Sequence, residues 1–161
     1  MKNSDAHYSF DTSALIDGME RFYPIDNFPG LWNRFDDLIK AGRIHVSEEA
    51  WKEAISVDSA LKDWCTDSSG GRERCVVPTD AAIAAVAGAI VQQFPNWTQQ
   101  GNKNHADPFV IAVAEIRSCA VISGEANGGP GRPKIPYVCS QRQVKHGKFI
   151  AVVVAEGWVF G

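Results

Sequence analysis

Four acidic side chains of this sequence lie close to the end or the beginning of an apolar run. They are Asp11, Glu53, Asp107 and Glu125. Apolar runs at residues 8–10, 44–46 and 120–123 precede three of them, and an amphipathic run at 108–114 follows Asp107. In an open α/β sheet, ligands bind beyond the carboxyl ends of parallel strands. We therefore expect these carboxylates to converge at that edge of a sheet.

Carboxylates that converge in this way need a cation between them, because several cannot all stay ionised at close range. Mg²⁺ and Mn²⁺ prefer carboxylate and water oxygens as ligands. The sequence thus predicts Mg²⁺ or Mn²⁺ held directly by Asp11, Asp107 and Glu125. Glu53 would ligate the ion or act through water.

Each of these residues also has an ordinary structural interpretation. Asp107 precedes a proline and an apolar run, which is typical of a helix N-cap. Asp11 would cap the helix that follows it. Glu53 alone would be a solvated helix residue, and Glu125 alone a loop charge.

The elements that would position these groups alternate along the chain. Strands are predicted at residues 8–11, 43–46, 120–122 and 135–138, while 149–155 fits either a strand or a buried helix. Helices are predicted at 13–21, 31–40, 59–66 and 108–118, with one more after Ser47 and another from Thr79 to about 94. Residues 67–72 are predicted as a loop, 99–104 as a polar connector and 124–133 as a flexible linker. This order predicts an α/β fold: a parallel β-sheet of about four to five strands, flanked by helices on both faces in three layers.

Composition fits one globular domain spanning residues 1–161. The chain has 161 residues, of which 45% are hydrophobic and 22% are charged. The N-terminus lacks the apolar core of a signal peptide, and the longest apolar run, 81–91, is too short to span a bilayer. A cytoplasmic protein with no membrane segment is expected.

The spacing of the cysteines argues against a zinc-binding site. Cys65, Cys75, Cys119 and Cys139 show no CxxC spacing, and no histidine completes a zinc pattern. Free, buried thiols are the first interpretation, with a Cys65–Cys75 disulfide as the alternative.

Charge is unevenly distributed, although the net formal charge is only −3. Residues 1–63 carry twelve acidic and seven basic side chains, whereas residues 126–161 carry one acidic and five basic. The basic stretch would steer a polyanion toward the acidic centre, or it is simply a solvated surface. Arg132 and Lys134 are the candidates within it for contacting a nucleic-acid backbone.

Four blocks of the sequence resemble those of PIN domains, in the same order and across nearly the whole chain. Phe10-Asp11-Thr12-Ser13-Ala14-Leu15-Ile16 is similar to the opening D-x-S-x-L-I block. The segment from Ile44 to Ala54 resembles the second block, a strand followed by a helix with one acidic residue. Ala106-Asp107-Pro108-Phe109-Val110-Ile111-Ala112-Val113-Ala114 is similar to A-D-x-x-I-A-x-A, the most specific of the four matches. Val121-Ile122-Ser123-Gly124-Glu125 stands where the family has a strand ending in T-x-D.

This resemblance implies a metal-dependent endoribonuclease. The family's most frequent member is the toxin of a bacterial VapC-type toxin–antitoxin pair, so an RNA substrate, a small antitoxin protein and a homodimer are implied. The catalytic residues would be Asp11, Glu53, Asp107 and Glu125, with Ser13 and Ser123 in support. Two departures from the family pattern are Glu125 in place of Asp and Ser123 in place of Thr, and Glu49 competes with Glu53 as the second acid.

Two other functions are compatible with the same residues. The first is a degenerate PIN-like module that binds RNA or a protein without cutting, for which the glutamate at position 125 is the best support. The second is a small-molecule phosphohydrolase with Asp11 as its nucleophile. That class has a D-x-D strand end, whereas this chain has Asp11-Thr12-Ser13.

Overall fold

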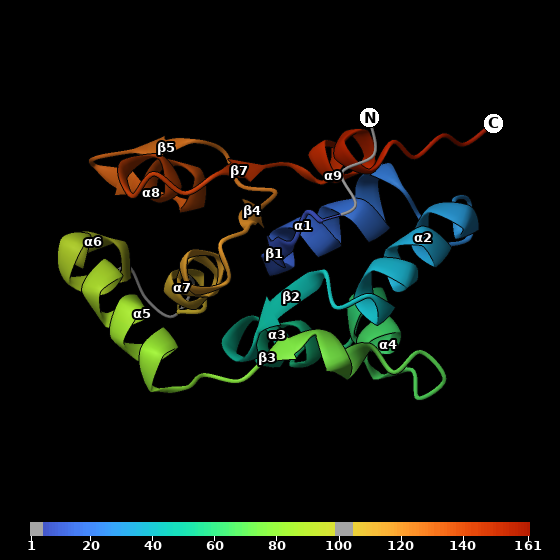
Figure 1. Cartoon of the computed structure of the whole chain (residues 1–161), viewed down its shortest axis with the longest axis horizontal. Coiled ribbons are helices and arrows are strands. Elements are labelled where there is room, and N and C mark those ends of the chain that lie inside the picture. Colours follow the sequence, from blue (N-terminus) through green and yellow to red (C-terminus); the bar gives the residue numbers. More distant parts are fainter. Residues whose placement is uncertain (1–4, 99–104) are drawn as a thin grey trace.

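A five-stranded parallel sheet forms the middle of the molecule (Figure 1). The computed structural model describes residues 5–98 and 105–161. The strands lie in the order β3 (Val76–Val77), β2 (Ile44–Ser47), β1 (Tyr8–Phe10), β4 (Ala120–Ile122) and β7 (His146–Gly147). The predicted parallel α/β sheet is confirmed.

Strand β1 lies at the centre of the sheet, and the chain adds β2 and β3 on one side of it and later β4 and β7 on the other. Tyr8 pairs with Ile44 of β2 on one side and with Ala120 of β4 on the other. All three residues of β1 are buried, so this strand lacks the polar face of a half-exposed sheet. A crevice is expected beyond the carboxyl ends of β1 and β4, because the connections leave in opposite directions at such a point.

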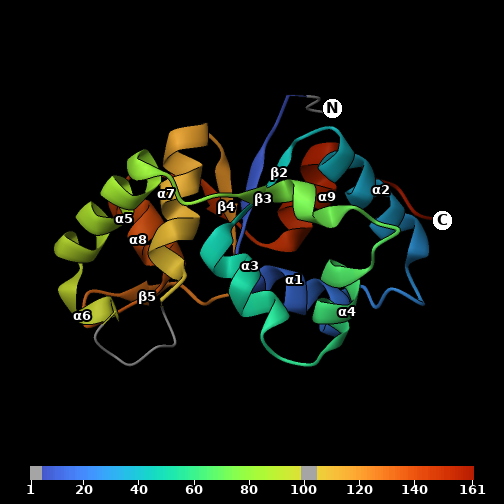
Figure 2. The same ribbon diagram turned by 90° about the horizontal axis from the view of Figure 1, so that it is seen from below.

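Helices cover both faces of the sheet, which confirms the predicted three layers (Figures 1 and 2). One face carries α5 (Ala81–Gln93), α6 (Pro95–Thr98), α7 (Asp107–Arg117) and α8 (Ile135–Gln141). The other face carries α1 (Thr12–Ile16), the π-helix η1 (Asp17–Phe22), α2 (Pro29–Lys40), α4 (Ala60–Thr66) and α9 (Phe149–Glu156). α3 (Glu48–Ile55) leads directly out of β2, and η2 (Arg72–Cys75) leads into β3.

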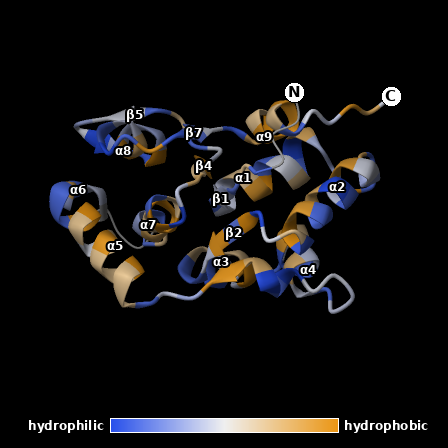
Figure 3. Cartoon of the chain, viewed as in Figure 1, coloured by the Kyte–Doolittle hydropathy of each residue, from blue (hydrophilic) through white to orange (hydrophobic). Residues whose placement is uncertain are grey.

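Aromatic side chains fill the layer between the sheet and α2. Phe10, Phe35 and Phe149 are all buried, and the ring centroids of Phe35 and Phe149 lie 5.7 Å apart in a stacked arrangement. Trp32 meets Phe35 edge-on at 5.5 Å. The hydropathy colouring in Figure 3 shows hydrophobic residues on β2 and in α5 and α9. No helix within residues 5–98 and 105–161 has the length and apolar content needed to cross a membrane.

The predicted strand at 135–138 is wrong, because these residues open helix α8. Pro136 occupies the first turn of that helix, a position that needs no backbone N–H, whereas within a central strand it would remove a ladder hydrogen bond. A short apolar run does not by itself distinguish a strand from a buried helix. The sheet takes its remaining strands from β3 and β7, which have only two residues each.

Smaller corrections concern the ends of elements and the loops. The predicted linker at 124–133 contains an antiparallel pair, β5 (Gly128–Gly129) with β6 (Arg132–Pro133). Asp80, not Thr79, caps α5, since its side chain accepts a hydrogen bond from the Ile83 N–H. Of the two interpretations of 149–155, the helix is correct. The connector at 99–104 lies outside the described residues. All four cysteines are free thiols, so Cys65 and Cys75 form no disulfide.

Candidate metal centre

Three carboxylates meet at the carboxyl edge of the sheet. Each of Asp11, Asp107 and Glu125 offers an oxygen, and these oxygens all lie within 4.8 Å of one another. Asp11 follows β1, Glu125 follows β4 after two residues, and Asp107 begins α7. Asp11 and Asp107 are only 3% and 5% exposed, while Glu125 is half-buried. The geometry brings together the same three residues that were predicted to ligate a metal.

Two serines hold the Asp11 carboxylate. The Ser13 hydroxyl donates a short hydrogen bond to Asp11 Oδ2, and the Ser123 hydroxyl lies 3.4 Å from the same oxygen. Ser13 Oγ also accepts a hydrogen bond from the Gly124 N–H at 2.9 Å. The first turn of α1 is thereby joined to the loop after β4. Although Asp11 occupies the N-cap position of α1, its side chain makes no capping hydrogen bond.

Asp107 is the first residue of α7, so the predicted N-cap is wrong; Ala106 holds that position without a capping side chain. The Asp107 carboxylate is directed into the acidic cluster instead of back along its own helix. Its Oδ2 atom is buried and finds no hydrogen-bond partner among the described residues. A buried carboxylate oxygen without a partner is costly. Its position in the cluster suits direct bonding to a cation.

A backbone N–H and a side-chain ammonium, each at the start of a later helix, hold Glu125. The N–H of Ile135, the first residue of α8, donates to Glu125 Oε2 at 2.9 Å. The Lys148 ammonium, at the N-cap of α9, donates a short hydrogen bond to the Glu125 carbonyl oxygen. Neither contact was predicted from the sequence. Ile135 was assigned to a strand, and no motif links Lys148 to Glu125. Pro136 was the signal for the start of a helix one residue earlier.

Glu53 lies beside the trio of carboxylates but is not one of the three. Its side chain is exposed on α3, and its charge raises the pKa of both Asp11 and Asp107. Glu49, the competing acid, instead lies beside basic side chains, with Lys52 Nζ at 3.5 Å and His105 Nε2 at 3.3 Å. Glu53 is therefore the acid of α3 that acts electrostatically on the cluster.

Burial and mutual repulsion disfavour negative charge in this cluster. Burial is the main cause that raises the pKa of Asp11, and the neighbouring charges of Glu125 and Glu53 add to it. The pKa of Asp107 is also raised, by burial first and then by the charges of Asp11, Glu125 and Glu53. A hard divalent cation would reverse both effects, and every donor in the trio is an oxygen. The residues present therefore fit Mg²⁺ or Mn²⁺.

The two predicted backbone-binding residues differ in their positions. Lys134 is half-buried at the N-cap of α8, and its charge lowers the pKa of Asp107, so it lies at the cluster. Arg132 is exposed on β6 of the β5–β6 hairpin. The geometry brings Lys134, but not Arg132, into electrostatic contact with the carboxylates.

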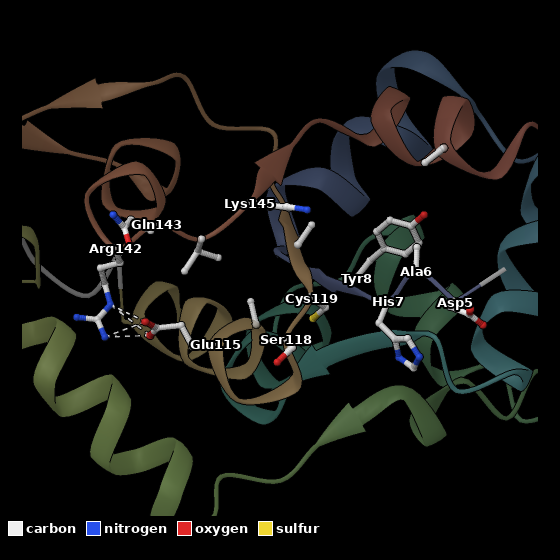
Figure 4. A pocket seen from close by; sticks show the side chains of 14 residues that line it. Asp5, Ala6, His7, Tyr8, Glu115, Ser118, Cys119, Arg142, Gln143 and Lys145 are labelled. Atoms are coloured by element: carbon white, nitrogen blue, oxygen red, sulfur yellow. Dashed lines mark hydrogen bonds and ion pairs between the residues drawn. The ribbon is translucent and has the colours of Figure 1, made fainter. Parts of the chain in front are cut away.

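A separate cleft of about 690 Å³ lies at the opposite edge of the sheet (Figure 4). Its walls include the segments that lead into β1, β4 and β7, at residues 5–8, 118–120 and 144–145. Arg142 in its wall is bound to Glu115, with Arg142 Nη2 2.9 Å from Glu115 Oε1. None of the three clustered carboxylates lines this cleft.

Fold and centre together define a three-layer α/β domain with an acidic, oxygen-lined site at the carboxyl edge of a parallel sheet. The chain belongs to the family described as domain of unknown function DUF4411, whose model matches residues 8–160. Among solved structures, the crystal structure of FitAcB from Neisseria gonorrhoeae is similar. That chain is 15% identical, with a TM-score of 0.48, and the match covers 85% of this chain and 94% of the other. No curated protein matches the sequence.

Proposed function

We propose that this protein is a metal-dependent endoribonuclease that hydrolyses RNA phosphodiester bonds. The observation that carries the proposal is the convergence of Asp11, Asp107 and Glu125, whose carboxylate oxygens lie within 4.8 Å. These residues come from positions far apart in the chain, and two of them are buried. An acidic cluster of this kind is electrostatically unfavourable without a cation.

Asp11, Asp107 and Glu125 would hold Mg²⁺ or Mn²⁺ directly, and Glu53 would ligate or act through water. Bound there, such an ion would lower the pKa of a water molecule and offset charge on the phosphate in an in-line displacement. Catalysis would then require no histidine or cysteine nucleophile.

Hydrogen bonds within the chain orient the carboxylates for metal binding. Burial raises the pKa of Asp11, and the hydrogen bond from Ser13 opposes this rise, which favours the ionised ligand. The Ile135 N–H orients Glu125. Lys134, beside Asp107, is placed to bind a phosphate of the RNA backbone, and Arg132 would contact the backbone further along the hairpin.

The resemblance to PIN domains supports a toxin of a toxin–antitoxin pair, with a small antitoxin as partner, a homodimer as assembly and the cytoplasm as location. The elements agree with the four blocks: Asp11 follows β1, Glu53 lies on the helix after β2, Asp107 opens α7 and Glu125 follows β4. In this proposal residues 8–161 form the core of a single PIN-like domain.

A PIN-like module that binds RNA or protein without cutting is the second candidate. The observation that favours it is Glu125 at the position of the family's aspartate, with one carboxylate oxygen already bound to the Ile135 N–H. In this candidate the remaining oxygens would not complete a catalytic ion site.

A Mn²⁺ titration by calorimetry tests the proposed site without any assumption about the RNA. Wild type is compared with Asp11→Asn and Asp107→Asn, and with Asp58→Asn as control, since the Asp58 side chain is 97% exposed. We expect binding to wild type and to the control, and none to the two site variants. Binding that survives both site substitutions would refute the assignment.

Cleavage of a mixed RNA pool in Mn²⁺ then separates the two candidate functions. The nuclease cuts RNA, and Asp11→Asn keeps its fold but loses the activity. Wild-type protein that binds Mn²⁺ yet leaves the RNA intact would favour the binding module.

A further inference from the structure

An apolar pocket of about 480 Å³ lies beside the acidic cluster, and we call it the Phe22 pocket. Three aromatic side chains line it: Phe22, Tyr23 and Phe149. Tyr23 and Phe149 form its inner wall, with ring centroids 5.5 Å apart. Phe22, at the end of η1, is 58% exposed, so one large ring remains available to a ligand.

The pocket adjoins the segments that carry Asp11 and Glu125. Gly124, which lies between Ser123 and Glu125, lines it, and Ala14 of α1 stands three residues after Asp11. Lys148 also lines the pocket while its ammonium binds the Glu125 carbonyl oxygen. A ligand in the pocket would therefore lie next to a group bound at the carboxylates.

Charge at the pocket is positive on balance. Its wall contains Arg21, Lys148 and Asp17. Arg21 lies 3.7 Å from Asp17, and its side chain is 73% exposed. This arrangement suits a ligand with a flat apolar part and a nearby negative charge.

We propose that the Phe22 pocket binds a nucleobase of the RNA, next to the phosphate that is cleaved. This inference rests on the proposed nuclease function and adds a base-binding subsite to it. Proteins recognise single-stranded RNA by stacking splayed-out bases on aromatic side chains. The pocket's volume falls within the range of small-ligand sites, and its lining is mainly apolar with few polar groups.

The test is a calorimetric titration in EDTA with the four nucleoside 5′-monophosphates and with ribose 5-phosphate. The proteins are wild type, Phe22→Ala and Phe160→Ala. Phe160 is a matched control, since it is 42% exposed and does not line the pocket. We expect at least one nucleotide to bind wild type more tightly than ribose 5-phosphate does. Phe22→Ala should weaken that binding by about 5- to 150-fold, which corresponds to stacking of about 1–3 kcal/mol, and Phe160→Ala should leave it unchanged.

Three results would overturn the base subsite. One is that wild type binds ribose 5-phosphate as tightly as it binds the nucleotides, which would assign the pocket to phosphate alone. Another is nucleotide affinity that Phe22→Ala does not alter. The third is a wild-type dimer that binds no nucleotide and that Phe22→Ala converts to monomer, which would make the pocket a protein interface.

Failure of the nuclease proposal would look different. Nucleotide binding in EDTA requires neither metal nor hydrolysis. Wild-type protein that binds nucleotides through Phe22 but cuts no RNA in Mn²⁺ would refute the nuclease and support the base pocket. If RNA is cut, sequencing of the ends should show a base preference at the cut site that Phe22→Ala reduces.

Discussion

The Ile135 backbone N–H donates a hydrogen bond of 2.9 Å to Glu125 Oε2. A donor at the beginning of α8 thus orients a carboxylate in the loop after β4. Glutamate has one more rotatable bond than aspartate, so its carboxylate needs an additional contact to be fixed in one position. The hydrogen bond from Ile135, ten residues later in the chain, restricts the freedom that the extra methylene gives to the Glu125 side chain.

Removing this hydrogen bond should weaken metal binding while leaving all the carboxylates in place. Ile135→Pro deletes the N–H at a helical position that tolerates proline, and Ile135→Ala is its control, since it shortens the side chain but keeps the N–H. By calorimetry we expect Ile135→Pro to bind Mn²⁺ about 10- to 100-fold more weakly than Ile135→Ala, the usual range for groups that orient metal ligands. Equal affinity in the two variants would show that the hydrogen bond has no role in binding.

The metal-free protein should lose stability as the pH rises. The folded-state pKa of Asp107 is raised, so the folded protein binds this proton more tightly than the unfolded chain does. The stabilising contribution is complete below the ordinary aspartate pKa of about 3.9, and it is lost as the pH rises toward the folded-state value. Each unit by which the pKa is raised corresponds to about 1.4 kcal/mol.

Asp107→Asn removes this titration. Thermal unfolding in EDTA should therefore give a flatter dependence of Tm on pH in the variant, with a higher Tm than wild type at neutral pH. Saturating Mn²⁺ should raise the Tm of wild type only, because a ligand that binds the folded state stabilises it. Parallel pH curves for the two proteins would contradict the assignment.

The backbone at Gly124 has no room for a side chain. A Cβ atom there would collide with the Asp17 carboxylate and would lie 2.9 Å from the Ser13 carbonyl oxygen. Gly124→Ala should destabilise the protein by about 1–3 kcal/mol and weaken Mn²⁺ binding, because the loop that carries Glu125 must move. Gly129→Ala in the nearby strand β5 is the matched control, since a Cβ there meets nothing within 4 Å. Urea unfolding with calorimetry measures both effects; identical behaviour of the two alanine variants would refute the prediction.

Tyr8 is expected to affect stability but not the metal centre. Its hydroxyl donates to Glu156 Oε2 at 2.7 Å, and Arg43 Nη2 lies 2.5 Å from the same oxygen. Tyr8→Phe removes one donor from a glutamate that is 2% exposed, at a cost of about 1–3 kcal/mol. Urea unfolding should show the loss, while the Mn²⁺ affinity stays at the wild-type value. A changed affinity would mean that the network reaches the carboxylates along β1.

The strands nearest the centre could be predicted from the sequence because their signals are local. β1, β2 and β4 are apolar runs bounded by polar residues, and Ser47 marks the start of α3 as its N-cap. β7 consists of His146 and Gly147, which carry no strand signal, so only its pairing with β4 identifies it. The error at 135–138 has another origin: a short apolar run fits a strand or a helix, and Pro136, which disfavours a central strand, was not taken into account.

The convergence of Asp11, Asp107 and Glu125 was predictable, because the ends of parallel strands share an edge. Ser13 and Ser123, which contact the Asp11 carboxylate, were also among the predicted residues, but the groups that hold Glu125 were not. The Ile135 N–H is a backbone group at a position whose structure was assigned wrongly, and the Lys148 contact spans 23 residues. The Phe22 pocket had no signal in the sequence, because Phe22 and Tyr23 lie at the end of η1 whereas Phe149 begins α9, far along the chain.

The position of β1 between β2 and β4 has a consequence for synthesis of the protein. Tyr8 pairs with Ile44, but its partner on the other side, Ala120, leaves the ribosome much later. Such long-range pairing slows folding, since the intervening chain must be ordered before the contact forms. Asp11 meets Glu125 only after β4 is in place, and Glu125 is anchored only when Ile135 has emerged. A nascent chain that has not yet reached Ile135 has no complete, anchored cluster of carboxylates, so full metal binding at this site requires synthesis through α8.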